Sequence, residues 1–327
     1  MKIVRWLHIP FVLVALCLGF ATIPAAQGQE LDYGLKPQKV AENTWLLIGR
    51  NEDFTLKNGG NIVNTGFIVT SAGVVVIDTG PSRLYGEQML RAIAKITDKP
   101  VIKVFNTHHH PDHYLGNQSF AGVKIAALAE TIREQISDGG AFTDNVYRMS
   151  GDWIKGTEST PAKEPVQAGR QQFGDHELEL LSLHGHTSAD MAILDHRTGV
   201  LFAGDLVFHD RAATTPHAVI QHWLATLDRL ENTPFQLLVP GHGAPVTDQR
   251  AIRQTRDYLL WVDRAMREAT TSGEEMAELI ARPIPAEFAG IALAAEEFAR
   301  SVAHLYRRYE AETFKPTPKP TPKPTAR

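Results

Sequence analysis

The sequence has almost no cysteine: Cys17 is the only one among 327 residues. A disulfide needs two cysteines, so no disulfide framework holds this chain together, and no cysteine beyond residue 17 can ligate a metal. The body also lacks a block of basic residues, and the formal net charge is −4. Nucleic-acid binding usually needs a clustered basic surface, so we expect no nucleic-acid partner.

The first segment lacks an apolar run long enough to cross a membrane. Residues 9–20 are apolar apart from one proline and one glycine, which is shorter than the roughly 20 residues of a spanning helix. Lys2 and Arg5 precede this run, and small residues follow it. This order predicts a signal peptide over residues 1–28, a periplasmic or secreted protein, and no stable membrane span after removal of the signal. A lipid anchor at Cys17 fits less well, because the preceding residues are not the small ones preferred there.

The last residues differ in composition from the body. Residues 313–327 are rich in proline, lysine and threonine, which predicts a disordered, extended tail rather than a packed core. The 43% hydrophobic content of the chain is that of a globular protein. We therefore expect one domain over residues 29–312, with mainly helical structure from residue 247 onward.

Short apolar runs and helical patterns alternate along this body, and the plan occurs twice. We expect helices at 82–96, with Ser82 as N-cap, at 129–137 and at 218–231. We expect residues 138–172, which are polar and contain several glycines, to form a long loop or lid. Expected strands are 44–49, 62–70, 74–78, 101–106, 123–128, 178–183, 191–195, 200–204 and 236–239. Antiparallel strand clusters with helices between them predict an α+β fold, a four-layer αββα sandwich.

The strongest chemical signal is a histidine-rich segment directly after the expected strand 101–106. It has the pattern His-x-His-x-Asp-His, formed by His108, His110, Asp112 and His113. Alternate side chains of an extended segment point the same way, so His108 and His110 can bind one ion together. Asp112 and His113 can face a second ion as the chain turns. Imidazole nitrogens and carboxylate oxygens are ligands that zinc accepts.

Three further polar residues follow apolar runs and have glycine beside them. They are His186, Asp205 and His242. Glycine allows the backbone to turn tightly beside a metal. His184 competes with His186 as a ligand, and we prefer His186 because glycine precedes it and threonine follows it.

These motifs resemble those of the metallo-β-lactamase superfamily, which carries them in the same order. The resemblance spans roughly residues 40–245. It implies that His108, His110 and His186 hold a first metal, that Asp112, His113 and His242 hold a second, and that Asp205 bridges them. In the family, the aspartate that matches Asp78 supports the metal loop without binding metal.

The resemblance also implies a function. The segments 58–80, HHHPDHYLGN and LFAGDLVF resemble periplasmic zinc hydrolases associated with quinoprotein dehydrogenase systems. We expect two Zn²⁺, with iron or manganese as alternatives, and a metal-bridging hydroxide that attacks an ester, thioester or lactone of a small-molecule substrate. Asp112 would accept a proton during turnover. The alternatives are a mono-iron enzyme similar to persulfide dioxygenases and a metal-binding accessory protein of a quinoprotein system. The sequence does not address the oligomeric state.

Further residues are candidates for the substrate pocket. Tyr114 adjoins the metal motif, and its hydroxyl can donate to an oxyanion, although packing explains it equally well. Four residues that follow Asp205 could also line the pocket: His209, Arg211, His217 and His222. Arg211 can hold a substrate carboxylate through its guanidinium fork. The alternative for these four is a solvated loop and helix N-terminus.

Overall fold

The computed structural model describes residues 31–314, and from Asp32 onward these form one compact unit. The predicted signal peptide with Cys17, and residues 315–327 of the predicted tail, lie outside the described residues. Within residues 31–314, no helix combines the length and the apolar character needed to cross a bilayer.

The first half of the chain builds a seven-stranded mixed sheet in the order β1-β2-β3-β4-β5-β6-β7. Strands β1 to β4 pair antiparallel, whereas β4 to β7 pair parallel. The strands are β1 (Gln38–Ala41), β2 (Thr44–Leu47), β3 (Thr65–Val69), β4 (Val74–Ile77), β5 (Val101–Phe105), β6 (Lys124–Leu128) and β7 (Glu164–Val166).

The second half builds a five-stranded sheet in the order β12-β11-β10-β9-β8. Strands β8 to β11 form an antiparallel meander, and β12 joins β11 in parallel. The strands are β8 (Gly169–Phe173), β9 (His176–Leu183), β10 (Asp190–Asp195), β11 (Val200–Phe208) and β12 (Leu237–His242).

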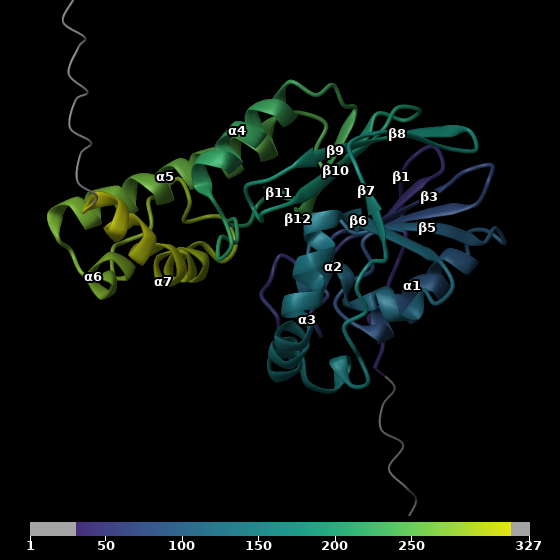
Figure 1. The fold of residues 1–327 in the computed structure, drawn as a ribbon, viewed down its shortest axis with the longest axis horizontal. Coiled ribbons are helices and arrows are strands. Elements are labelled where there is room, and N and C mark those ends of the chain that lie inside the picture. Colours follow the sequence, from purple (N-terminus) through teal and green to yellow (C-terminus); the bar gives the residue numbers. More distant parts are fainter. Residues whose placement is uncertain (1–30, 315–327) are drawn as a thin grey trace, which may run out of the picture. The chain divides into compact units, whose positions relative to one another are not determined.

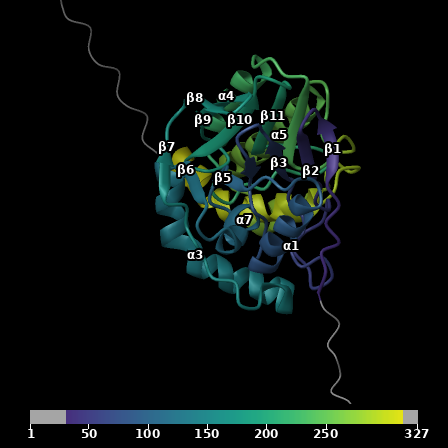
Figure 2. The ribbon, with the colours of Figure 1, turned by 90° about the vertical axis from the view of Figure 1, so that its right-hand side faces the viewer.

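The two sheets pack face to face, and helices cover both outer faces (Figure 1). Helix α1 (Arg83–Ala94), whose first turn is capped by Ser82, packs on the first sheet, and α3 (Ala129–Ser150) lies on the same side (Figure 2). The second sheet is covered by α4 (Ile220–Glu231) and α5 (Arg250–Ser272), and α7 (Ala294–Thr313) packs against α5. The short helices are α2 (Pro111–Tyr114), α6 (Met276–Ile280) and the 3₁₀ turns η1 (Leu115–Ser119) and η2 (Gly151–Ile154). The chain therefore has the expected four-layer αββα architecture.

Two expectations about local structure are wrong. Residues 138–172 are not one long loop, because α3 continues to Ser150 and is followed by η2, β7 and the start of β8. Gly139, one of the glycines that favoured a loop, lies inside α3, where a side chain would collide with Ser159. The strand clusters are also not purely antiparallel, since both sheets contain parallel pairs.

Candidate metal centre

The segment after β5 turns at once into the short helix α2. Pro111 occupies the first position of this helix, where its missing N–H costs nothing, and His110 is the extended residue before it. The carboxylate of Asp78 holds the start of the turn by accepting hydrogen bonds from Thr107 N and Thr107 Oγ1, both at 2.8 Å. Strand pairing and this anchor fix the direction in which the histidine side chains leave the backbone.

The order and direction of the strands in the second sheet place His186, Asp205 and His242 at the same edge. Strands β9 and β11 are both antiparallel to β10, so they run in the same direction, and β12 is parallel to β11. Their C-terminal parts therefore meet at the same edge. His186 follows β9, and His242 is the last residue of β12. Asp205 was expected just beyond a strand end, but it lies within β11, next to a register shift at Gly204.

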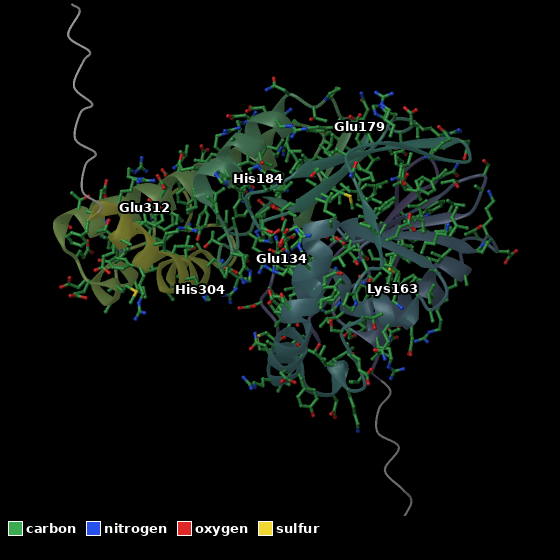
Figure 3. All side chains as sticks on the ribbon, viewed as in Figure 1. Glu134, Lys163, Glu179, His184, His304 and Glu312 are labelled. Carbon is green, nitrogen blue, oxygen red and sulfur yellow. The ribbon has the colours of Figure 1, made fainter. Side chains whose placement is uncertain are left out.

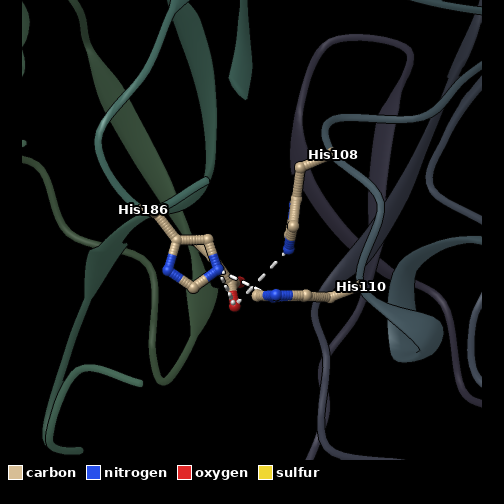
Figure 4. Close-up of side chains that lie close together, drawn as sticks. His108, His110 and His186 are labelled. Carbon is tan, nitrogen blue, oxygen red and sulfur yellow. Dashed lines mark hydrogen bonds and ion pairs between the residues drawn. The ribbon is translucent and has the colours of Figure 1, made fainter. Parts of the chain in front are cut away.

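Three histidines and Asp205 form the first cluster of possible ligand atoms. Figure 4 shows the imidazoles of His108, His110 and His186 pointing towards one another. His186 Nε2 lies 2.9 Å from His110 Nδ1 and 3.4 Å from Asp205 Oδ2, and His108 Nε2 lies 3.9 Å from Asp205 Oδ2. One atom from each of the four residues lies within 4.8 Å of the others.

Asp112, His113 and His242 form the second cluster. Asp112 Oδ2 lies 3.4 Å from His242 Nε2 and 3.8 Å from His113 Nε2. Asp205 also reaches this cluster, since its Oδ1 lies 3.0 Å from His113 Nε2 and its Oδ2 lies 3.3 Å from His242 Nε2. The carboxylate of Asp205 thus lies between the two clusters.

Hydrogen bonds on the far side of the rings set the orientation of the histidines. His113 Nδ1 donates to Asp78 Oδ2 at 2.7 Å, His242 Nδ1 donates to Ile62 O at 2.8 Å, and His186 Nδ1 donates to Thr214 O at 3.1 Å. A neutral imidazole with a proton on Nδ1 presents a bare lone pair at Nε2. Each of these contacts therefore directs a lone pair into the centre, as in known metal sites.

The donor set fits metal ions. His108 Nε2, His113 Nε2 and Asp205 Oδ1 are buried and have no hydrogen-bond partner among residues 31–314. His113 Nε2 and Asp205 Oδ1 lie 3.0 Å apart without hydrogen-bond geometry. Burial opposes a positive charge on His113, but the carboxylates of Asp205, Asp78 and Asp112 together raise its pKa well above the usual range, so this part of the centre attracts positive charge. Burial keeps the pKa of His108 well below its usual range and lowers the pKa of His186 to about 3, so both rings are in the neutral form that binds metal. Cations would satisfy all of these groups.

A pocket of about 470 Å³ opens beside the centre, and His110, Asp112, Asp205 and His242 all line it. This volume lies within the usual range of small-molecule sites. Its remaining walls combine apolar side chains with basic ones. They are Asp53, Phe54, Ile62, Pro111, Phe142, Asn145, Met149, Arg211, Thr214, Pro216, His217, Arg300 and His304.

Of the residues proposed for the pocket, Arg211 and His217 line it, whereas Tyr114, His209 and His222 do not. Tyr114 is fully buried against Leu115, and its hydroxyl lies 3.0 Å from Ser159 Oγ, so it packs beneath the centre. His209 turns away because its Nδ1 bonds Ala244 O at 2.7 Å.

The remaining histidines differ in their relation to the centre. His184 lies outside both clusters, with its ring against His222. His109 points to Glu134 on α3, and its Nδ1 lies 3.1 Å from Glu134 Oε2. Its ring nevertheless lies only 4.8 Å from that of His110, so the two rings are neighbours.

Sequence reasoning missed the side of the pocket formed by the C-terminal helix. Arg300 and His304 line the pocket and come from α7, whereas Glu134, which contacts His109, comes from α3 in the opposite outer layer (Figure 3). No local pattern marks Arg300 or His304, because both reach the pocket only through tertiary packing. His217 lines the pocket as the sequence suggested, and its Nδ1 lies 2.8 Å from His110 Nε2.

Comparison with known proteins agrees with this geometry. The model of the metallo-beta-lactamase superfamily matches residues 58–242, more than half of the chain, so this chain belongs to that superfamily of metallo-hydrolases.

Curated relatives are distant. The chain is 24% identical over 285 residues to a linear primary-alkylsulfatase of Pseudomonas sp., covering 72% of this chain and 53% of that protein. It therefore spans about half the length of the alkylsulfatase. It is 25% identical over 256 residues to the acyl-coenzyme A thioesterase MBLAC2 of Bos taurus, covering 68% of this chain and 88% of the thioesterase. It is 26% identical to the metallo-beta-lactamase IND-1 of Chryseobacterium indologenes, covering 55% of this chain and 71% of that enzyme.

Solved structures show the same fold. A metallo-beta-lactamase from Pontibacter korlensis aligns with a TM-score of 0.56 at 22% identity, covering 69% of this chain and 99% of the other. The metallo-beta-lactamase IND-7 aligns with a TM-score of 0.55 at 22% identity, covering 69% of this chain and 98% of the other. The family match ends at His242, so α5, α6 and α7 lie beyond it.

Proposed function

We propose that this chain is an exported hydrolase that binds two zinc ions and cleaves an ester, thioester or lactone bond in a small molecule. The observation that carries the proposal is the position of Asp205, whose carboxylate approaches His186 of one cluster and both His113 and His242 of the other. A shared carboxylate between two sets of nitrogen and oxygen donors is a typical arrangement for a two-metal site.

The residues would divide into two ligand sets. His108, His110 and His186 would hold one ion, Asp112, His113 and His242 the other, and Asp205 both. Bound zinc would supply Lewis-acid chemistry, lowering the pKa of a water to about 7 and polarising the oxygen of the scissile group.

The protein's own side chains would do the rest. Asp112 lines the pocket and would accept, at a carboxylate oxygen, the proton that the attacking water releases. Asp78 holds His113 through its Nδ1 proton and anchors Thr107, so the donor geometry is set before substrate arrives. Phe142 and Met149 form an apolar wall that would exclude bulk water.

The relatives support the substrate class at a coarse level. Two of them are named as an alkylsulfatase and an acyl-coenzyme A thioesterase, both of which are hydrolases of ester-like bonds. Export is supported by the order of basic, apolar and small residues at the start of the sequence.

Elemental analysis of the purified mature protein, run beside chromogenic ester, thioester, lactone, phosphodiester and β-lactam substrates, tests the proposal. We expect about two zinc ions per chain and turnover of an ester, thioester or lactone. About one iron per chain without hydrolysis would overturn the proposal in favour of a mono-iron enzyme. Full zinc occupancy without turnover of any substrate would instead favour an accessory role.

A further inference from the structure

The guanidinium of Arg211 is incompletely paired although it is buried. The side chain is only 2% exposed and lines the pocket that holds Asp112 and Asp205. Its NH2 reaches Glu297 Oε1 at 3.4 Å, but Nε and NH1 have no hydrogen-bond partner among residues 31–314. Phe208 lies under the cation, with 5.8 Å from the guanidinium carbon to the ring centre. A buried donor without an acceptor is unfavourable, so these two nitrogens call for a partner that enters the pocket.

Helix α7 holds this arginine in place. Glu297 of α7 is fully buried, and its Oε1 also accepts from Arg300 NH1 at 2.7 Å and from Thr214 Oγ1 at 2.9 Å. Arg300 then reaches Asp53 Oδ2 at 2.6 Å, and both residues line the pocket. Arg211 therefore shares one carboxylate oxygen, Glu297 Oε1, with two other donors. Glu297 Oε2 is also buried without a hydrogen-bond partner among residues 31–314, as are Nε and NH1 of Arg211.

The charges of Arg211 and Arg300 balance those of Glu297 and Asp53, so a net charge does not indicate which ligand binds here. The hydrogen-bond donors of Arg211 that have no acceptor indicate the chemistry of the ligand. An acceptor that matches a guanidinium fork is a planar or tetrahedral oxyanion, such as a carboxylate or a sulfate. The rest of the pocket wall includes Phe54, Ile62 and Phe142, which suit an apolar portion of the same molecule.

We propose that the substrate carries an anionic oxygen group that binds Arg211, and that α7 makes the enzyme selective for such substrates by holding this arginine through Glu297. The inference rests on the proposed hydrolase function for its kinetic readout. It concerns a part of the chain beyond the family match, since α7 follows residue 242.

Two esters that differ only by a carboxylate test the proposal: p-nitrophenyl propionate and mono-p-nitrophenyl succinate. We expect the zinc-loaded wild type to prefer the anionic ester in kcat/KM by about 10- to 100-fold, as hydrogen bonds to a charged group allow. Arg211→Gln should collapse this preference, and Arg211→Lys should restore part of it. The control Arg170→Gln, at an exposed arginine on β8, should keep the preference.

Calorimetric titration of succinate into metal-depleted wild type and Arg211→Gln gives a readout that does not depend on catalysis. We expect binding that weakens by about 10-fold or more in the variant. A wild type without preference for the anionic ester, or an Arg211→Gln variant that keeps it, would overturn the inference. If neither ester is hydrolysed, the thioester and lactone substrates of the panel above decide the hydrolase proposal, and the titration alone decides whether Arg211 binds an anion. Equal binding by both proteins would then overturn the inference as well.

Discussion

The two sheets contribute to the candidate metal centre in different ways. The first sheet gives four possible ligands within six consecutive residues, His108 to His113, all from one turn after β5. The second sheet gives three, His186, Asp205 and His242, from three strands and across 57 residues of chain. The first set depends on a local backbone turn, whereas the second exists only because β9, β11 and β12 run in the same direction. A local motif is visible in the sequence, but a dispersed set becomes a site only when the sheet forms.

The largest expected effect comes from removing one candidate ligand from the turn after β5. His108→Ala should remove metal and lower hydrolysis by about 1,000-fold or more, because one Nε2 donor of the first cluster is lost. The measurement is metal content by elemental analysis beside kcat/KM. His184→Ala is the matched control, since that histidine lies outside both clusters. Full metal content and activity in His108→Ala would show that the ligand assignment is wrong.

The candidate ligands of the second sheet can be disturbed by adding a side chain at Gly241, in β12. A Cβ on Gly241 would overlap Asp205 Oδ1, so Gly241→Ala must displace the carboxylate that lies between the clusters. We expect loss of about half the bound metal or more and a stability cost of about 1–3 kcal/mol from overpacking. Gly140→Ala is the control, because its side chain would point into open space on α3. Normal metal content in Gly241→Ala would contradict the close approach of β11 and β12.

The turn that carries His186 depends on a carboxylate with a shifted pKa. Burial raises the pKa of Asp190 to about 6, against hydrogen bonds from Thr187 that lower it. Because the folded pKa lies above the ordinary value of 3.8, the protonated form stabilises the fold at low pH, and this stability is lost as the pH rises from 3.8 to about 6.

The free energy of unfolding, measured in urea across this range, checks the expectation for Asp190. The wild type should lose about 3 kcal/mol relative to Asp190→Asn, which cannot ionise. Parallel pH profiles for the two proteins would mean that Asp190 titrates normally.

The smallest expected effect tests a contact between the two regions. His217, from the second half of the chain, approaches His110 Nε2 at 2.8 Å and orients a ligand of the first half. His217→Ala should weaken metal binding by about 10-fold, measured by competition with a chelator. His222→Ala, on α4, should have no such effect. An unchanged affinity in His217→Ala would show that the turn after β5 orients His110 without help.

Errors in the sequence-based expectations have physical causes. The positions of β2 to β6 and β9 to β12, and the capping of α1 by Ser82, were predictable, because they depend on neighbouring residues. The short strands β1, β7 and β8 were not expected. The helical run to Ser150 was missed because Gly139 and Gly140 suggested a break. A glycine in a helix costs only about 1 kcal/mol, and here Gly139 allows α3 to approach Ser159 and the hydroxyl of Tyr114. Packing therefore overrode a local preference.

The sequence by itself determined the superfamily, the layered fold and the residue types of the metal centre, because these follow from short-range periodicity and from motifs a few residues long. Only the tertiary structure decided which side chains complete the pocket. Arg211 and Glu297 are 86 residues apart, and their contact depends on how α7 packs against α5. Contacts of this kind leave no periodic signal in the sequence, so the side of the pocket that α7 forms became visible only in three dimensions.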